Sequence, residues 1–171
     1  MSEENEKLRV GSFAEVDGDA IKMFFESKGS SVFIHGANCR RVMGAGIAAQ
    51  VREQIAPLYF LDAFDSRPAN QRFGSFSATV LAEDENQVKV GVNLYTQLDP
   101  GPNFDINALV NSLRSFVSTV KDTSRADFTI FSPKIGAGIG GGDWEKIEQV
   151  LREELKDFNV MIVNFNQVKE N

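Results

Sequence analysis

Two kinds of hydrophobic pattern run along the chain, one typical of strands and one typical of helices. Nearly continuous apolar runs predict strands that are buried on both faces, at 30–37, 127–133 and 160–165. Apolar residues at helical spacing predict helices at 19–27, 45–56, 57–64, 105–121 and 143–158. Shorter apolar stretches predict strands at 7–13, 73–84 and 87–96, the last two joined by a hairpin turn.

Strands that alternate with helices predict the fold class α/β, as a three-layer α/β/α sandwich with a mixed, largely parallel central sheet. The hairpin provides the antiparallel element. Because no linker interrupts the 171 residues, we expect a single domain over 1–171, with a core at about 8–166 and polar tails at 1–7 and 167–171. In open sheets of this kind, ligands bind beyond the carboxyl ends of the strands.

Composition narrows the classes of function. The formal net charge of −6 argues against bulk nucleic-acid binding, which requires a basic surface. The sequence has no run of about 18 apolar residues, no pattern of a secretory signal, and only one cysteine, Cys39. We therefore expect a cytoplasmic monomer that contacts no membrane. Because the acidic residues lack metal-ligand spacing, we also expect no metal, and we expect no cofactor.

The tetrapeptide Gly-Ala-Gly-Ile occurs twice, in MGAGIAAQ at 43–50 and in IGAGIGGG at 135–142. Both copies fit the dinucleotide fingerprint G-x-G-x-x-G/A, but neither lies in a tight first turn with an acidic residue about 20 positions further on. A Rossmann site is therefore disfavoured. Glycine-rich backbone and helix N-termini both bind anions, so the two loops predict a diphosphate site gripped from both sides. The alternative is that both are turns in which glycine serves only close packing.

Three stretches of the chain, in this order, are similar to the macrodomain family. They are VFIHGANCRRVMGAGIAAQV from residue 32, NLYTQ from residue 93 and FSPKIGAGIGGGDW from residue 131. The resemblance covers about Leu8 to Phe165. It implies an α/β/α module that binds ADP-ribose or a derivative, as a free ligand or on an ADP-ribosylated protein. Some members of the family also remove ADP-ribose from proteins, or phosphate from ADP-ribose 1″-phosphate.

The resemblance also implies which residues form the site. Asn38 would contact the distal ribose, and Gln97 occupies a site position at the end of the central strand. The first loop would lie beside that ribose and the diphosphate, through Gly44, Ala45, Gly46 and Ile47. The second loop would cradle the phosphates, through Ile135, Gly136, Ala137, Gly138, Ile139, Gly140 and Gly141.

The chain departs from the family's pattern at both ends of the expected site. The turn at 11–13 is expected at the family's Gly-Asp-Ile position, whose Asp recognises adenine, so Ser12 and Phe13 become the adenine contacts. Asp17 or Asp19 is the candidate substitute for the missing Asp. The branch that removes ADP-ribose from glutamate uses a lysine and an aspartate, which are Gln97 and Gly140 here. These replacements count against that mechanism.

His35, the only histidine, and Trp144 resemble residues of the phosphatase branch. A neutral imidazole at a strand end can act as an acid or a base, whereas the alternative is a buried histidine bonded to backbone. We expect a phosphatase for ADP-ribose 1″-phosphate with His35 as its catalytic residue, assisted by the substrate's own diphosphate. A non-catalytic ADP-ribose-binding module and a hydrolase of ADP-ribosyl groups with another catalytic set remain the alternatives.

Several neighbouring residues allow two interpretations. Arg40 and Arg41 either meet a terminal phosphate or form a solvated pair, and Lys134 is placed to attract an anion. Phe104 either covers a ribose or anchors its loop, and Cys39 is either a nucleophile or a packing residue.

Overall fold

Six strands form one sheet in the part of the chain that the structure, a computed structural model, describes: residues 11–120 and 127–165. The strand order is β1-β6-β5-β2-β4-β3. The parallel strands are β1 (Phe13–Gly18), β2 (Ser31–Asn38), β4 (Val88–Gln97), β5 (Thr129–Ser132) and β6 (Asn159–Phe165). The edge strand β3 (Phe76–Glu83) runs antiparallel to β4, which confirms the predicted mixed sheet and its hairpin.

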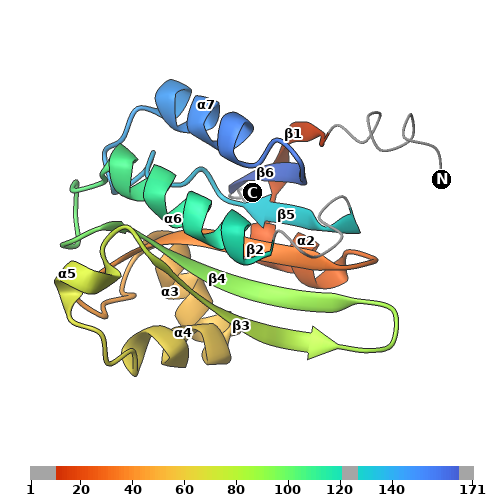
Figure 1. Cartoon of the computed structure of the whole chain (residues 1–171), viewed down its shortest axis with the longest axis horizontal. Coiled ribbons are helices and arrows are strands. Elements are labelled where there is room, and N and C mark those ends of the chain that lie inside the picture. The colour runs from red at the N-terminus through yellow and green to blue at the C-terminus, as the bar shows by residue number, and fades with distance from the viewer. Residues whose placement is uncertain (1–10, 121–126, 166–171) are drawn as a thin grey trace, which may run out of the picture.

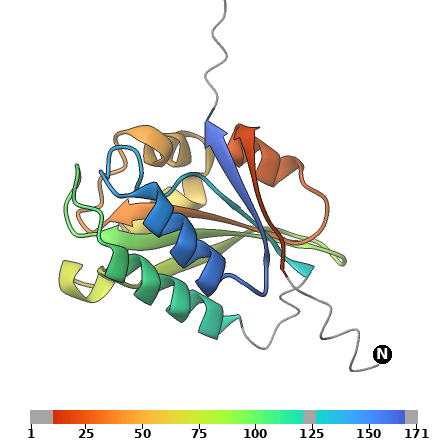
Figure 2. The same ribbon diagram turned by 90° about the horizontal axis from the view of Figure 1, so that it is seen from above.

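Helices cover both faces of the sheet, as Figure 1 shows. One face carries α2 (Ala20–Glu26), α3 (Gly46–Gln54) and α4 (Ala56–Ala63). The other face carries α6 (Ile106–Thr119) and α7 (Trp144–Glu154), which lie side by side in Figure 2. The three-layer α/β/α arrangement is therefore confirmed. A short helix, α5 (Ala69–Arg72), was not predicted, because four residues are too few to show a helical period.

The sheet separates two hydrophobic clusters. Neighbouring residues of the central strand β2 point to opposite faces, so that Ile34 joins the cluster under α6 and α7 while Phe33 joins the cluster under α2, α3 and α4. Burial of each such side chain contributes about 1.5–3 kcal/mol to folding. This burial on both faces explains why β2 has a nearly continuous apolar sequence. No helix in the described ranges has the length and apolar character needed to cross a membrane.

The first strand differs from the prediction. It begins at Phe13 and ends at Gly18, whereas the sequence pattern placed it at 7–13, mostly outside the described residues. β1 lies at the edge of the sheet, and its polar positions Glu15 and Asp17 interrupt the apolar run that was used to locate strands. The shift matters for function because Phe13 pairs with Val160 at the amino end of β6, while Gly18 pairs with Phe165 at the carboxyl end.

The N-terminus of α3 lacks the side-chain cap that α6 and α7 have, although all three helices begin near the carboxyl edge of the sheet. Asp105 and Asp143 cap α6 and α7 by accepting from the backbone N–H of Ala108 and Glu145. In contrast, α3 has Ala45 at its N-cap, and no side chain accepts from its first turn. The N-terminal N–H groups of α3 are thus left for another acceptor.

Candidate functional site

A cavity of about 730 Å³ opens at the carboxyl edge of the sheet. Its walls come from the ends of β2, β4 and β6 and from the two glycine loops, which are half a chain apart in sequence. Parallel strands bring their carboxyl ends to one edge, and this is the reason that the two Gly-Ala-Gly-Ile copies meet. The cavity lies within the 300–1,000 Å³ range that is usual for small-molecule sites.

The first loop leads directly into the N-terminus of α3. Gly44, Ala45, Gly46 and Ile47, the expected ligand contacts of this loop, all line the cavity. Gly46 has φ +59, a left-handed conformation that glycine adopts at low cost, and it begins the helix. Because the first turn of α3 has no side-chain cap, its backbone N–H groups form a positive helix end suited to a phosphate.

The second loop is folded on itself by short backbone hydrogen bonds. Gly142 N–H donates to the Gly136 carbonyl at 2.7 Å, and Gly141 N–H donates to the Gly138 carbonyl at 3.1 Å. The N–H groups of Gly136, Gly138, Ile139 and Gly140 donate to no other described residue. Such a group of unpaired N–H donors is an anion-binding nest. Of the expected phosphate contacts, residues 135–140 line the cavity and Gly141 lies outside the lining.

Phe104 supports the second loop from behind. A Cβ at Gly136 would lie 2.4 Å from the Phe104 ring, and a Cβ at Gly142 would lie 2.7 Å from it, so both positions require glycine. The Phe104 N–H also donates to the Gly140 carbonyl at 3.2 Å. Of the two interpretations of Phe104, the structure supports the loop anchor. Gly138 differs from both glycines, because a Cβ there would meet nothing within 4 Å.

The expectation that Ser12 and Phe13 contact adenine is wrong, because both residues lie away from the cavity. Both lie at the amino end of β1, on the sheet edge opposite the cavity, where Ser12 Oγ donates to Asn159 Oδ1 at 3.0 Å. The reason is the displaced first strand, which moves the turn at 11–13 to the wrong end of the sheet. Neither residue lines the cavity.

The carboxyl end of β6, paired with the carboxyl end of β1, lies at the cavity where the turn at 11–13 was expected. Asn164 and Phe165 line the cavity, and Phe165 is 60% exposed. Asn164 Nδ2 donates to Asp17 at 3.3 Å, while Asp19 caps α2 through the N–H of Lys22. Sequence reasoning missed Asn164 and Phe165, although the end of the last predicted strand was a signal that could have located them.

Asn38 and Gln97 line the cavity, and both side chains also hold backbone groups beside it. The Asn38 amide accepts from Arg40 N–H at 2.9 Å and donates to the Val42 carbonyl at 2.8 Å. Gln97 Nε2 donates to the carbonyls of Asp99 and Gly101. Gln97 thus holds the loop that follows β4, a role that the sequence did not indicate.

His35 does not reach the cavity. Its side chain is fully buried on the opposite face of β2, where it stacks on Phe33, and its Nε2 lies 2.6 Å from Asn93 Oδ1. The Asn93 amide donates to the Leu58 carbonyl, which identifies His35 Nε2–H as the donor to Oδ1. Burial lowers the pKa of His35 from 6.5 to about 4, so the ring is neutral. This placement matches a structural histidine and argues against the catalytic role expected from the sequence.

The basic residues around the cavity are engaged by protein groups. Lys134 lines the cavity, but its Nζ lies 3.1 Å from Glu15 and over the Trp144 ring. Arg40 pairs with Asp99 at 2.7 Å, and Arg41 donates to the Asp65 carbonyl. Cys39 is buried beside the cavity and does not line it.

No strong acid or base is offered by the cavity wall. Its polar side chains, within the described residues, are Asn38, Thr96, Gln97, Lys134 and Asn164, without a carboxylate, imidazole, thiol or phenol. The site therefore combines backbone anion donors with amide, hydroxyl and aromatic groups. These are groups that orient a ligand rather than groups that transfer protons.

The sequence has relatives among curated proteins, although no family model matches it. An uncharacterised 17.5 kDa protein of enterobacteria phage T4, from the tk-vs intergenic region, is 31% identical over 151 residues, covering 88% of this chain and 94% of that protein. The ADP-ribose 1″-phosphate phosphatase of Scheffersomyces stipitis is 28% identical, covering 86% of this chain and 98% of that protein.

Solved structures share the fold at lower identity. The macrodomain of Mycobacterium tuberculosis DarG matches with a TM-score of 0.67 and 20% identity, over 90% of this chain and 97% of that chain. Thermosipho africanus DarTG, solved in complex with ADP-ribose, matches with a TM-score of 0.68 and 23% identity, over 94% of this chain and 43% of that chain. The chain therefore has the macrodomain fold.

Proposed function

We propose that the protein binds ADP-ribose in the cavity at the carboxyl edge of the sheet. One observation carries the proposal: two loops line the same cavity, and each has backbone N–H donors that bond to no other described residue. A diphosphate between the N-terminus of α3 and residues 136–140 satisfies both sets of donors. The complex of the similar DarTG protein with ADP-ribose supports this choice of ligand.

The other parts of the ligand follow from the two ends of the cavity. The distal ribose lies toward Asn38, whose amide retains one unbonded N–H after its contacts within the turn. The adenosine lies toward Phe165, whose exposed ring is available for stacking on a base. Asp19 stands nearby at the end of β1, with one carboxylate oxygen bonded to Lys22 N–H and the other free to accept from an amino group.

Hydrolysis of ADP-ribose 1″-phosphate is a second candidate function, favoured by the phosphatase of Scheffersomyces stipitis among the relatives. In such a reaction water attacks phosphorus, the bond between phosphorus and the C1″ oxygen breaks, and inorganic phosphate and ADP-ribose leave. The cavity wall supplies no carboxylate or imidazole base for the water, so the ligand's diphosphate takes its proton and returns it to the C1″ oxygen as that bond breaks. The loop N–H groups stabilise charge on the phosphates. Gln97 and Gly140 provide no lysine and aspartate for removing ADP-ribose from glutamate.

Calorimetry with ADP-ribose, followed by phosphate release from ADP-ribose 1″-phosphate, tests both functions on one sample. Saturable 1:1 binding of ADP-ribose supports the binding function, and absence of heat at millimolar ligand contradicts it. Phosphate release that disappears in Gly138→Val, where the cavity is filled, supports the phosphatase. Tight ADP-ribose binding by the wild type without phosphate release identifies a binding module.

A further inference from the structure

We infer that Arg72 is a positioning residue, which fixes the turn at residues 38–41 so that Asn38 is held ready for the distal ribose. The inference rests on the proposed function for the ligand that the turn contacts. The mechanical link between Arg72 and the turn rests on the structure alone. Arg72 lies outside the cavity wall, and nothing in the sequence pattern marked it.

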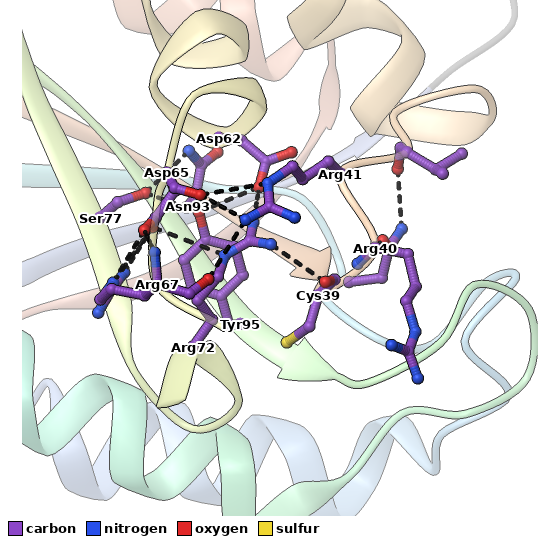
Figure 3. Close-up of polar contacts among 12 residues, drawn as sticks. Cys39, Arg40, Arg41, Asp62, Asp65, Arg67, Arg72, Ser77, Asn93 and Tyr95 are labelled. Carbon is purple, nitrogen blue, oxygen red and sulfur yellow. Dashed lines mark hydrogen bonds and ion pairs between the residues drawn. The ribbon is translucent and has the colours of Figure 1, made fainter. Parts of the chain in front are cut away.

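Arg72 is a fully buried cation at the end of α5. Its exposed fraction is 0%, and that of its partner Asp62 is 1%. The guanidinium bonds to the Asp62 carboxylate, lies 3.6 Å from Asp65 Oδ2 and stacks over the Tyr95 ring at 4.6 Å. Figure 3 shows Arg72 of α5 surrounded by Asp62 of α4, Asp65 of the segment after α4, and Tyr95 of β4. Contacts on several sides leave the guanidinium one orientation.

The remaining contact of Arg72 is with the turn itself. Its Nη1 donates to the Cys39 carbonyl at 3.0 Å, while the Cys39 N–H donates to the Leu98 carbonyl at 3.0 Å. Both backbone groups of Cys39 are therefore fixed from outside the turn. Asn38 precedes Cys39, and its amide bonds only within the turn and to Val42. The orientation of Asn38 consequently depends on where Cys39 is held.

A second set of hydrogen bonds joins the turn at residues 38–41 to the segment from Asp62 to Arg72. Arg41 adopts φ +62, a left-handed conformation that is unfavourable for a residue with a side chain. Its guanidinium donates to the backbone carbonyls of Asp65 and Arg67. The segment from Asp62 to Arg72 thus contacts the turn at two residues. Arg72 bonds to the Cys39 carbonyl, and the carbonyls of Asp65 and Arg67 accept from Arg41.

Stability alone does not explain a buried ion pair at this place. Desolvation offsets much of the attraction between buried charges, and apolar residues of similar volume often give equal or greater stability. A guanidinium differs from an apolar side chain in that it donates several hydrogen bonds in fixed directions. At Arg72 this property connects the carboxylates of Asp62 and Asp65 to one carbonyl of the ligand-contacting turn.

The test replaces the ion pair by apolar residues, in the double variant Arg72→Met and Asp62→Leu. This change leaves no buried carboxylate without its cation, and Tyr95 Oη keeps its bond to Ser77 Oγ at 2.9 Å. Arg67→Met is the matched control, because the Arg67 side chain bonds to Asp65, Ser75 and Phe76 and not to the turn. Amide exchange by NMR and calorimetry with ADP-ribose and ADP are measured on each protein.

In the double variant, the N–H groups of Cys39 and Arg40 should exchange faster than in the wild type while core amides stay protected. Affinity for ADP-ribose should fall by about tenfold, the value of one lost hydrogen bond, and affinity for ADP should change by less than about twofold. Arg67→Met should leave both readouts at wild-type values. Unchanged exchange at Cys39 and Arg40 overturns the inference whatever the protein binds. Equal losses for both ligands overturn it as well, whereas failure of the wild type to bind ADP-ribose contradicts only the proposed function.

Discussion

Gly138→Val separates ligand binding from folding more cleanly than any other change in the second loop. Gly138 lines the cavity, a Cβ there meets no atom within 4 Å, and the residue is not in the left-handed region, so a side chain fits at the cavity wall without disturbing the loop. We expect the free energy of unfolding to change by less than about 0.5 kcal/mol. Gly136→Ala gives the opposite result, because its Cβ would strike the Phe104 ring and φ is +73.

The effect of Gly138→Val on binding follows from the donors that surround it. The N–H groups of Gly138, Ile139 and Gly140 donate to no other described residue, and all three residues line the cavity assigned to the diphosphate. Displacing the ligand from two charge-assisted hydrogen bonds costs about 3–4 kcal/mol, or a factor of several hundred in affinity. Calorimetry with ADP-ribose and thermal unfolding measure the two effects. A valine variant that binds ADP-ribose within about threefold of the wild type refutes the diphosphate assignment.

Three further changes test two buried polar groups of the fold and the anchor of the second loop. The pKa of His35 is about 4 in the folded state and 6.5 in the unfolded state, so the unfolded state binds a proton first as pH falls. The free energy of unfolding should therefore decrease by about 3 kcal/mol between pH 6.5 and about 4. His35→Gln should flatten this part of the stability curve in urea titrations without altering ADP-ribose affinity, and an unchanged curve contradicts the buried neutral ring. Phe104→Ala should cost about 2 kcal/mol in thermal unfolding and weaken ADP-ribose binding, while Phe104→Leu costs less; equal binding by both variants and the wild type argues against the loop anchor. Lys89 Nζ donates to the carbonyls of Phe24 and Ser27 at the end of α2, so Lys89→Met should cost about 1–3 kcal/mol in urea unfolding, and no loss would show that these bonds add nothing.

Patterns of burial predicted most of the fold, because strands buried on both faces and amphipathic helices leave clear sequence signals. β2 and α6 are examples, and both were located within a few residues of their observed bounds. The first strand was misplaced because an edge strand keeps polar residues on its exposed face, as Glu15 and Asp17 do. That single error moved the expected adenine contacts to the opposite edge of the sheet.

The candidate site was predictable where the backbone forms it and less so where side chains do. Glycine spacing located both loops, since unpaired N–H groups require little more than a turn at a strand end. The orientation of His35 was not predictable, because a single residue shift along a strand exchanges the two faces of the sheet. Arg72 gave no signal either, because its role depends on a contact with Cys39, which lies 33 residues away in sequence and meets it only in the fold.

The pairing of Lys134 with Glu15 has a consequence for the rate of ligand capture. The cavity wall in the described residues holds no other cation, and the protein carries a formal net charge of −6. A diphosphate therefore approaches against a repulsive field and is held only by short-range peptide dipoles once it arrives. Where a protein attracts an anionic ligand through a basic site, salt slows association because it screens that attraction. In this protein, moderate salt should speed the association of ADP-ribose. Long polyanions should be excluded more strongly than one molecule of ADP-ribose.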